Sequence, residues 1–302
     1  MPGPSPTPQA EIGDAVRTPT WMLAVLVLAA SGFGCGRAVN YLDPAAPFYT
    51  YPNEKPPVAP APEPPLRVVS FNIAYAIEID RAIAVIRENE GLRNPDILAL
   101  QEMDAPGTER IANALGMNAV YFPSGLHPKY HRDFGCAILS PWPLEEPRKI
   151  LLPHGARISG LRRAAVTAVV VRGEERIRVY SVHLPSPLGV SGGSREEQLR
   201  VLAADAASAE GPVVIAGDFN SHDRLQVLAK AGFNWVTRDL GDTAALLFMG
   251  IKLGGFSFDH VLARGLELAS GPEAVGIVQD NQGASDHKPI WAVLRPESSP
   301  RP

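Results

Sequence analysis

Short apolar runs that end in a polar, metal-compatible side chain recur along the chain. The run Val213–Ala216 follows Gly211-Pro212 and leads at once into Gly217-Asp218-Phe219-Asn220. Four apolar residues after a Gly-Pro pair predict a short buried strand, so Asp218 and Asn220 should point the same way where it leaves the core. Burying both groups costs free energy unless a cation, a polarised water or a phosphoryl group binds them. A turn in which both bond to their own backbone is the alternative.

Five further apolar runs stand beside groups of the same kind. The runs 66–71, 97–100, 177–182 and 256–258 lead into Asn72, Gln101-Glu102, His183 and Asp259, and Ser285-Asp286-His287 precedes the run 290–293. In layered sheet proteins, ligands gather outside the carboxyl ends of strands. The order therefore predicts one composite active site assembled from six strand ends.

Helical apolar spacing between these runs predicts helices over Arg81–Glu90, capped by Asp80, over Thr108–Leu115 and over Arg195–Ala209. The segments 164–171 and 176–182 flank Gly173-Glu174-Glu175 and predict a hairpin. Strands paired by hairpins and interrupted by single helices indicate sheets packed together with helices outside.

The N-terminal part differs in composition from the rest. Residues 1–20 are rich in proline and polar groups, which predicts disorder. Residues 21–35 are apolar, shorter than the roughly 20 apolar residues of a membrane span, and end in Cys35. We expect a lipid anchor at Cys35, with a cleaved secretory signal and an uncleaved membrane anchor as alternatives. The proline-rich residues 36–65 predict a semi-rigid linker, the domain should cover 66–296, and a disordered tail should cover 297–302.

Composition narrows the class of protein. A chain of 302 residues with 45% hydrophobic content can bury one sizeable core. A net charge of -4 argues against a surface that grips nucleic acid non-specifically, although a local Arg162-Arg163 pair would suffice for a nuclease. Two cysteines make no disulfide framework, and Cys136, in a strand-like run, should be a buried, inert thiol.

Taken together, these motifs resemble the endonuclease/exonuclease/phosphatase family. The residues that carry the resemblance, in order, are Asn72, Gln101-Glu102, His183, Gly217-Asp218-Phe219-Asn220, Asp259 and Ser285-Asp286-His287. The match covers roughly 66–294. It implies an α+β fold, a four-layer α/β/β/α sandwich of two mixed β-sheets with helices outside, and metal-dependent cleavage of a phosphoester bond.

The resemblance implies a metal site. Glu102, helped by Asn72, is the expected Mg²⁺ ligand, with Mn²⁺ as an alternative ion, because hard cations prefer carboxylate and amide oxygens. Asn72 also lies where the family contacts the phosphate. Asp286 would complete a second cation or water site. The metal would polarise the phosphoryl oxygen and stabilise the leaving group.

The resemblance also assigns the proton-handling groups. Asp218 would orient or deprotonate the attacking water, and Asn220 would hold that water or a phosphate oxygen. His287 would donate to the scissile phosphate while Asp259 fixes its tautomer. His183 would contact the phosphate or protonate the leaving oxygen.

Several further groups have two interpretations. Arg163 or its neighbour Arg162 resembles a family arginine that reaches a phosphate. His222 and His260 lack the spacing of a zinc site and are expected in loops. The polar segment 125–133 either touches substrate or is a solvated connection. Ser191-Gly192-Gly193-Ser194 lacks the lysine of a nucleotide loop and is expected to be flexible.

The predicted function is a metal-dependent phosphoesterase that hydrolyses a phosphodiester, or a phosphomonoester, by in-line attack of an activated water. Alternatives are a nuclease acting on extracellular DNA and an inactive, surface-tethered binding module of the same fold. A calcineurin-like phosphoesterase would need a Gly-Asn-His run, which the sequence lacks. DNA, a phospholipid headgroup and a small phosphodiester remain open as substrates. We expect a monomer in the cell envelope or outside the cell, held to a membrane through its N-terminus.

Overall fold

The computed structural model describes Gly3 and residues 37–53, 65–248 and 251–297. All the elements described below belong to one compact unit, residues 36–302. The predicted disordered segment 1–20, the apolar segment 21–35 with Cys35, and residues 298–302 lie outside the described residues, so these remain predictions. No helix in the described part of the chain is both long and apolar enough to span a membrane.

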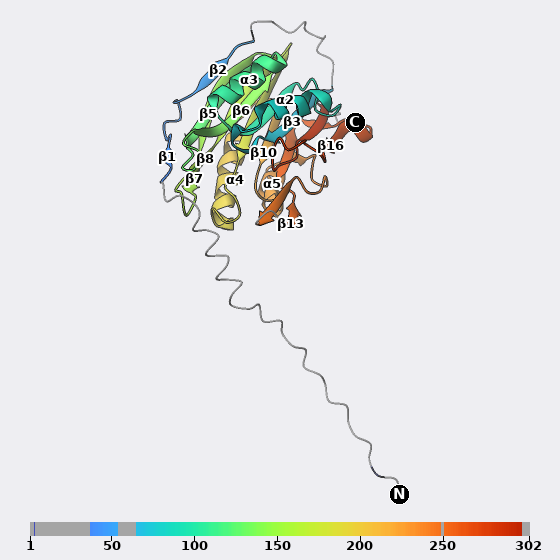
Figure 1. Cartoon of the computed structure of the whole chain (residues 1–302). Helices are drawn as coiled ribbons and strands as arrows, with labels where there is room; N and C mark the ends of the chain where they lie inside the picture. The colour runs from blue at the N-terminus through green and yellow to red at the C-terminus, as the bar shows by residue number, and fades with distance from the viewer. Residues whose placement is uncertain (1–2, 4–36, 54–64, 249–250, 298–302) are drawn as a thin grey trace. The chain divides into compact units, whose positions relative to one another are not determined.

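Two mixed β-sheets form the centre of the domain (Figure 1). The first has the order β1-β5-β6-β4-β3-β17-β15, with β2 added beside β5 and β16 beside β17. Its strands are β1 (Val39–Asn40), β2 (Tyr49–Tyr51), β3 (Leu66–Asn72), β4 (Ile97–Met103), β5 (Asn118–Leu126), β6 (Asp133–Ser140), β15 (Leu266–Leu268), β16 (Val275–Ile277) and β17 (Ile290–Pro296).

The second sheet has the order β11-β14-β10-β9-β8-β7, and a separate two-stranded ribbon pairs β12 with β13. The strands are β7 (Leu144–Gly155), β8 (Arg162–Arg172), β9 (Glu175–His183), β10 (Val213–Asp218), β11 (Asn234–Trp235), β12 (Ala244–Phe248), β13 (Ile251–Phe256) and β14 (Asp259–Arg264). Strands β8 and β9 form the predicted hairpin.

The period-two alternation of the strands explains why the two sheets pack face to face. In β10, Val214 and Ala216 belong to the core between the sheets, whereas Val213 and Ile215 pack on the opposite side. Because successive strand residues point to opposite faces, a strand that is apolar throughout is buried on both faces. This accounts for the continuous apolar run that precedes Asp218.

Helices cover the two outer faces. Helices α2 (Ile79–Glu88) and α3 (Ala105–Leu115) pack on the first sheet, and α4 (Gly192–Ala207) and the short α5 (Gln226–Lys230) pack on the second. Three 3-10 turns, η2 (Ala74–Ala76), η3 (Asp223–Leu225) and η4 (Pro272–Ala274), lie in connections. The layers are therefore α/β/β/α, which confirms the predicted four-layer α+β sandwich.

The helices begin earlier than the apolar spacing predicted. Asp80 is not the cap of α2: it lies in the first turn, and its carboxylate pairs with Arg110 at 2.6 Å. Helix α3 begins after Asp104, whose side chain accepts a hydrogen bond from Gly107 N at 2.8 Å. The segment 191–194, predicted to be flexible, forms the start of α4, because the Ser191 hydroxyl accepts from Ser194 N and caps the helix.

The single described cysteine, Cys136, lies in β6 between the sheets and is 2% exposed. Burial raises the pKa of its thiol to about 12. A thiol with so high a pKa is protonated at neutral pH and is a poor nucleophile. The expectation of a buried, inert thiol is confirmed.

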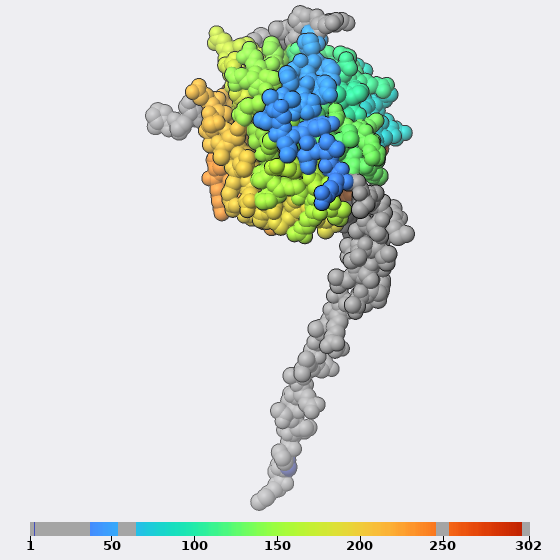
Figure 2. All heavy atoms as spheres, turned by 90° about the vertical axis from the view of Figure 1, so that its left-hand side faces the viewer, coloured from blue at the N-terminus to red at the C-terminus, as the bar shows by residue number. Residues whose placement is uncertain are grey.

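The first half of the predicted linker belongs to the fold. Figure 2 shows residues 37–53, in blue, lying along the surface of the domain. Strands β1 and β2 both pair with β5. On the second sheet, the Lys149 ammonium of β7 is 4% exposed and donates to the carbonyl oxygens of Tyr41 and Ala46 at 3.0 and 2.8 Å. The linker prediction is wrong here because two backbone acceptors satisfy a buried lysine on a strand far along the chain.

Replacing this lysine should release the segment. We expect Lys149→Met to destabilise the fold by about 1–3 kcal/mol, the range for losing charge-assisted hydrogen bonds, and to accelerate cleavage by chymotrypsin after Tyr41 or Phe48. Limited proteolysis with mass spectrometry measures this, with the exposed Lys230→Met as the matched control. Equal cleavage rates in the two variants would contradict the anchoring role.

Candidate active site

Strand register brings three of the predicted residues into one row. Asp218, the last residue of β10, lies opposite His183 on the parallel strand β9 and opposite Asp259 on the antiparallel strand β14. Asp259 therefore begins its strand and does not end one, which corrects the sequence-based placement. Because β14 runs antiparallel to β10, its start lies at the same edge of the sheet as the carboxyl end of β10. All three side chains are at most 3% exposed.

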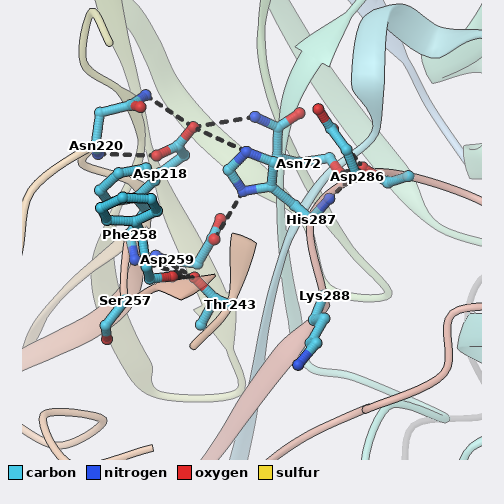
Figure 3. A network of polar contacts seen from close by, with 12 residues as sticks. Asn72, Asp218, Asn220, Thr243, Ser257, Phe258, Asp259, Asp286, His287 and Lys288 are labelled. Atoms are coloured by element: carbon cyan, nitrogen blue, oxygen red, sulfur yellow. Dashed lines mark hydrogen bonds and ion pairs between the residues drawn. The ribbon is translucent and has the colours of Figure 1, made fainter. Parts of the chain in front are cut away.

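The first sheet completes the site from the other side. Asn72 ends β3, and its Nδ2 donates to Asp218 Oδ2 at 3.1 Å across the two sheets (Figure 3). Asn220 Nδ2 donates to the same oxygen at 3.0 Å, and Asn220 N donates to Asp218 Oδ1 at 2.8 Å. The predicted turn, in which Asp218 bonds to nearby backbone, is therefore present. Asp218 also has partners from both sheets. Two carboxamides fix the orientation of its carboxylate.

His287 and Asp259 form a close pair beside Asp218. His287 Nδ1 lies 2.8 Å from Asp259 Oδ2, and Nε2 lies 3.7 Å from Asp218 Oδ2. Burial lowers the pKa of His287, but the charges of Asp259 and Asp218 and the hydrogen bond to Asp259 outweigh it and hold that pKa well above its ordinary value. The ring is therefore an imidazolium at neutral pH. Nδ1 donates to Asp259, and Nε2 faces Asp218.

Asp218 itself has a pKa raised to about 7, chiefly by burial, against the opposing charge of His287. The negative charge of Asp259 raises it further, and the hydrogen bond from Asn220 N lowers it. A carboxylate whose pKa lies near neutral pH is suited to general-base work, because it is both available and basic enough to accept a proton.

Glu102 reaches the site through a backbone irregularity. A register shift between Leu100 and Met103 interrupts the pairing of β4 with β6, and Glu102 adopts a left-handed φ of 59°. Its Oε1 lies 3.8 Å from His183 Nε2, and its Oε2 accepts from Tyr75 N at 3.1 Å. Burial raises the pKa of Glu102, while Arg163 and His287 lower it. Strict alternation would place Gln101 and Glu102 on opposite faces, so the bulge brings the carboxylate to the site.

The two neighbouring arginines of β8 are separated by the structure. Arg163 Nη1 lies 3.4 Å from His183 Nδ1, and its guanidinium stacks over the Phe134 ring at 4.5 Å. Arg162 instead donates to Leu152 O at 3.1 Å, away from His183. Burial, then the charges of Arg163 and His287, hold the pKa of His183 well below its ordinary value. His183 is therefore neutral beside a cationic arginine, and Arg163 is the arginine that faces the site.

Thr243, immediately before β12, is a site residue that the sequence motifs missed. Its hydroxyl oxygen accepts from the backbone N–H groups of Phe258 and Asp259, both at 3.0 Å (Figure 3). Its carbonyl accepts from Lys288 N at 2.7 Å, and Ala244 pairs with His287 through an isolated β-bridge. Thr243 thus joins the backbones that carry Asp259 and His287. No local motif marks a lone threonine of this kind.

Two groups of side chains are candidate ligands for a divalent cation. Among the described acidic, His and Cys side chains, Asp218, Asp259 and His287 have ligand atoms within 4.8 Å of one another. An imidazolium has no free lone pair, however, so His287 would have to lose its proton to coordinate a metal. Glu102, with the remaining lone pair of the Asn72 oxygen, offers hard oxygen ligands of the kind Mg²⁺ prefers. Asp286 is exposed, and its charge raises the pKa of Glu102.

The remaining predicted groups fall in different places. His260 is not in a loop: it lies in β14, is fully buried and packs edge-on against Trp235 at 5.0 Å. His222 is partly exposed, and its ring lies 4.6 Å from that of the same tryptophan, tilted by 46°. The segment 125–133 is more than a solvated connection, since His127 and Tyr130 are half-buried and their rings lie 4.9 and 4.4 Å from that of Tyr75.

Known proteins share this architecture. A UPF0294 protein of Yersinia enterocolitica is 27% identical over 256 residues, which cover 80% of this chain and 88% of that protein. An endonuclease/exonuclease/phosphatase from Beutenbergia cavernae superposes with a TM-score of 0.62 at 23% identity, covering 77% of this chain and 72% of that one. TDP2 of D. rerio, solved with a single-strand DNA product, gives a TM-score of 0.58 at 15% identity, covering 77% of this chain and all of that one.

The family model of the endonuclease/exonuclease/phosphatase family matches residues 69–287. This range begins in β3, ends at His287 and includes every site residue described above. With its sandwich of two sheets and its motifs in the family order, the chain belongs to the endonuclease/exonuclease/phosphatase family, whose members are phosphodiesterase-, nuclease- and phosphatase-type hydrolases.

Proposed function

We propose that this protein is a metal-dependent phosphodiesterase in which water attacks phosphorus in line with the leaving oxygen. The observation that carries the proposal is the buried Asp218 carboxylate, which lies 3.7 Å from the protonated His287 and is oriented by the carboxamides of Asn72 on the first sheet and of Asn220 just beyond β10. One group accepts a proton and its neighbour donates a hydrogen bond, as hydrolysis of a phosphoester requires.

Asp218 would position the water and take its proton. Its Oδ2 already accepts from Asn72 and Asn220, so its orientation is fixed before substrate arrives. Asn220 would hold the water through its carboxamide oxygen, since its Nδ2 is bound to Leu184 O and Asp218. Preorganisation of this kind lowers the barrier because no reorganisation is needed during the reaction.

His287, His183 and Arg163 would bind the phosphate as negative charge develops. His287 Nε2 donates its proton as a hydrogen bond, while Asp259 holds the other ring nitrogen. Arg163 adds a fixed positive charge beside the neutral His183. Because this part of the site is buried, its electrostatic interactions are stronger than they would be in water.

A divalent cation would be held by Glu102 and Asn72, with Asp286 near enough to contribute through water. Such an ion polarises a phosphoryl oxygen and stabilises the leaving oxygen. The family is generally dependent on divalent metals, and the oxygen ligands present fit Mg²⁺, with Mn²⁺ as the alternative.

An inactive binding module of the same fold is the weaker alternative. Burial of Asp218 and Glu102 raises both pKa values, so each carboxylate is costly to keep where it is. A binder that had lost its chemistry would gain stability by replacing them. A nuclease acting on extracellular DNA is consistent with the same site. Location in the cell envelope, anchoring through Cys35 and a monomeric state remain part of the proposal.

Removing the proposed base tests catalysis directly. Asp218→Asn should lower kcat on bis-p-nitrophenyl phosphate with Mg²⁺ by about 10²–10⁴-fold, the usual contribution of a general base, while the fold persists. EDTA should abolish the wild-type rate. Asp223→Asn, at a fully exposed carboxylate, is the matched control and should behave as wild type. Equal rates in Asp218→Asn, His287→Asn and wild type would disprove enzymatic function.

The two hydrogen bonds that the Thr243 hydroxyl accepts give a second test. Thr243→Val keeps the shape but leaves the Phe258 and Asp259 N–H groups without their acceptor, so kcat should fall about tenfold, equivalent to roughly 1.4 kcal/mol. The high-pH limb of the kcat profile should move to lower pH, because a displaced Asp259 supports the His287 imidazolium less well. Thr243→Ser should restore both values. If the high-pH limb of the kcat profile of Thr243→Val coincides with that of the wild type, Thr243 has only a structural role.

Metal binding should stabilise the fold more strongly at higher pH. Burial raises the pKa of Glu102, the proposed metal ligand, above its ordinary value, so the contribution of this carboxyl to the stability of the metal-free protein is present below the pKa of the unfolded state and is lost as pH rises through the pKa of the folded state. Because Mg²⁺ competes with protons for such carboxylates, its effect on Tm should be larger at about pH 8 than at about pH 5. Differential scanning fluorimetry measures this, and a pH-independent shift would contradict it.

The variant Glu102→Gln provides the control for that measurement. It removes the proposed metal ligand, so Mg²⁺ should no longer raise its Tm at either pH. A variant that retains the full Mg²⁺ shift would place the metal elsewhere in the protein.

A further inference from the structure

One side of the site is a wall of aromatic rings. Tyr75, from η2, lies with its ring centroid 4.4 Å from Tyr130, 4.9 Å from His127 and 5.7 Å from Phe134. Phe134 in turn lies 5.7 Å from the ring of His183. Phe134 is buried, whereas Tyr75, His127 and Tyr130 are each partly exposed. The wall therefore runs from the phosphate-binding residues to solvent.

The backbone that presents Tyr75 is held in an unfavourable conformation. Ala74, Tyr75 and Ala76 have φ values of 41°, 62° and 52°, a left-handed turn that residues with a Cβ adopt rarely. Tyr75 N donates to Glu102 and Ala74 N donates to Asn72, each at 3.1 Å. The proposed metal ligands thus also hold the turn. Strain of this kind persists where surrounding contacts determine it, and it concentrates at functional sites.

The second side of the turn is fixed by a cation. Arg132 Nη1 donates to Tyr75 O at 3.1 Å and lies 3.5 Å from an Asp104 carboxylate oxygen. Tyr75 itself lies within electrostatic reach of Glu102, Arg163 and Asp286, whose charges act on the pKa of its phenol. The ring is therefore held at the mouth of the site and is not a free surface side chain.

The charged side chains beside these rings indicate what the wall would bind. Arg163 lies 4.5 Å from the Phe134 ring and Lys129 Nζ lies 4.8 Å from the Tyr130 ring. Burial and these two cations lower the pKa of His127 to about 4, so the imidazole is neutral and the charges that act on it are positive. A quaternary ammonium headgroup would have to compete with the two cations that already lie over these rings. A flat, uncharged ring attached to a phosphate would be favoured by both features.

We propose that Tyr75, His127 and Tyr130 form a stacking subsite for a nucleobase, so that the substrate is a nucleotidyl phosphodiester with its base on this wall and its phosphate at Asp218. This inference rests on the proposed function and narrows its substrate class. A polynucleotide and a small nucleotide ester share this chemistry, since each presents a base beside a phosphodiester.

Two esters that differ only in the nucleoside test the subsite. The p-nitrophenyl ester of thymidine 5′-phosphate should have a kcat/KM about 5- to 100-fold higher than methyl p-nitrophenyl phosphate, the range expected for one stacked base. Tyr130→Leu should bring this ratio down at least fivefold, whereas Tyr130→Phe should keep it. Tyr49→Leu, at a partly exposed tyrosine on β2 whose ring lies 5.8 Å from that of Tyr121, is the matched control and should leave the ratio unchanged.

The ratio is measured within each protein, so a loss of folded enzyme does not alter it. A wild-type ratio near one, with both esters hydrolysed in an EDTA-sensitive reaction, overturns the subsite and leaves the proposed function standing. Faster turnover of sphingomyelin vesicles than of the thymidine ester also overturns it. No hydrolysis of any of them removes the proposed function as well. A short single-stranded oligonucleotide, compared with the thymidine ester, then tells which of the two nucleotide sources is preferred.

Discussion

The structure depends on one buried carboxylate at the seam between two sheets. Asp218 accepts hydrogen bonds from Asn72 of the first sheet and Asn220 beyond its own strand, and it lies beside His183 and His287. An isolated ion there would be expensive to bury. The partners of Asp218 therefore determine where the apolar sandwich ends in a polar site. Burial raises the pKa of Asp218 against the charge of His287, to a value suited to catalysis.

The surrounding elements serve this arrangement. Antiparallel pairing of β14 with β10 brings Asp259 to the same edge as Asp218, and Thr243 ties the backbone of Asp259 to that of His287. A bulge in β4 redirects Glu102, and the left-handed turn after Asn72 places Tyr75 beside it. Rigid strands hold the reacting groups, while turns and bulges set what surrounds them.

Much of this could be predicted from the sequence, for identifiable reasons. Apolar runs predicted the strands, and the polar residues beside them predicted the order of the site residues. Hairpins and single helices predicted sheets packed together with helices outside, and the family resemblance predicted the four-layer sandwich. The sequence could not decide between Arg162 and Arg163, because a shift of one residue along a strand moves the side chain to the opposite face of the sheet. Thr243 carried no signal, since its role comes from contacts between segments distant in sequence.

The incorrect predictions have a common cause. Composition predicts a linker over residues 36–65, but Lys149, more than a hundred residues later, binds the carbonyls of Tyr41 and Ala46. No local pattern distinguishes a buried strand histidine such as His260 from one in a loop, and the helix that Asp80 is predicted to cap begins one residue before it.

The central claim is that water attacks phosphorus directly. Hydrolysis of a phosphorothioate diester of defined configuration in ¹⁸O-water tests it most directly: inversion at phosphorus is predicted, and retention would contradict it.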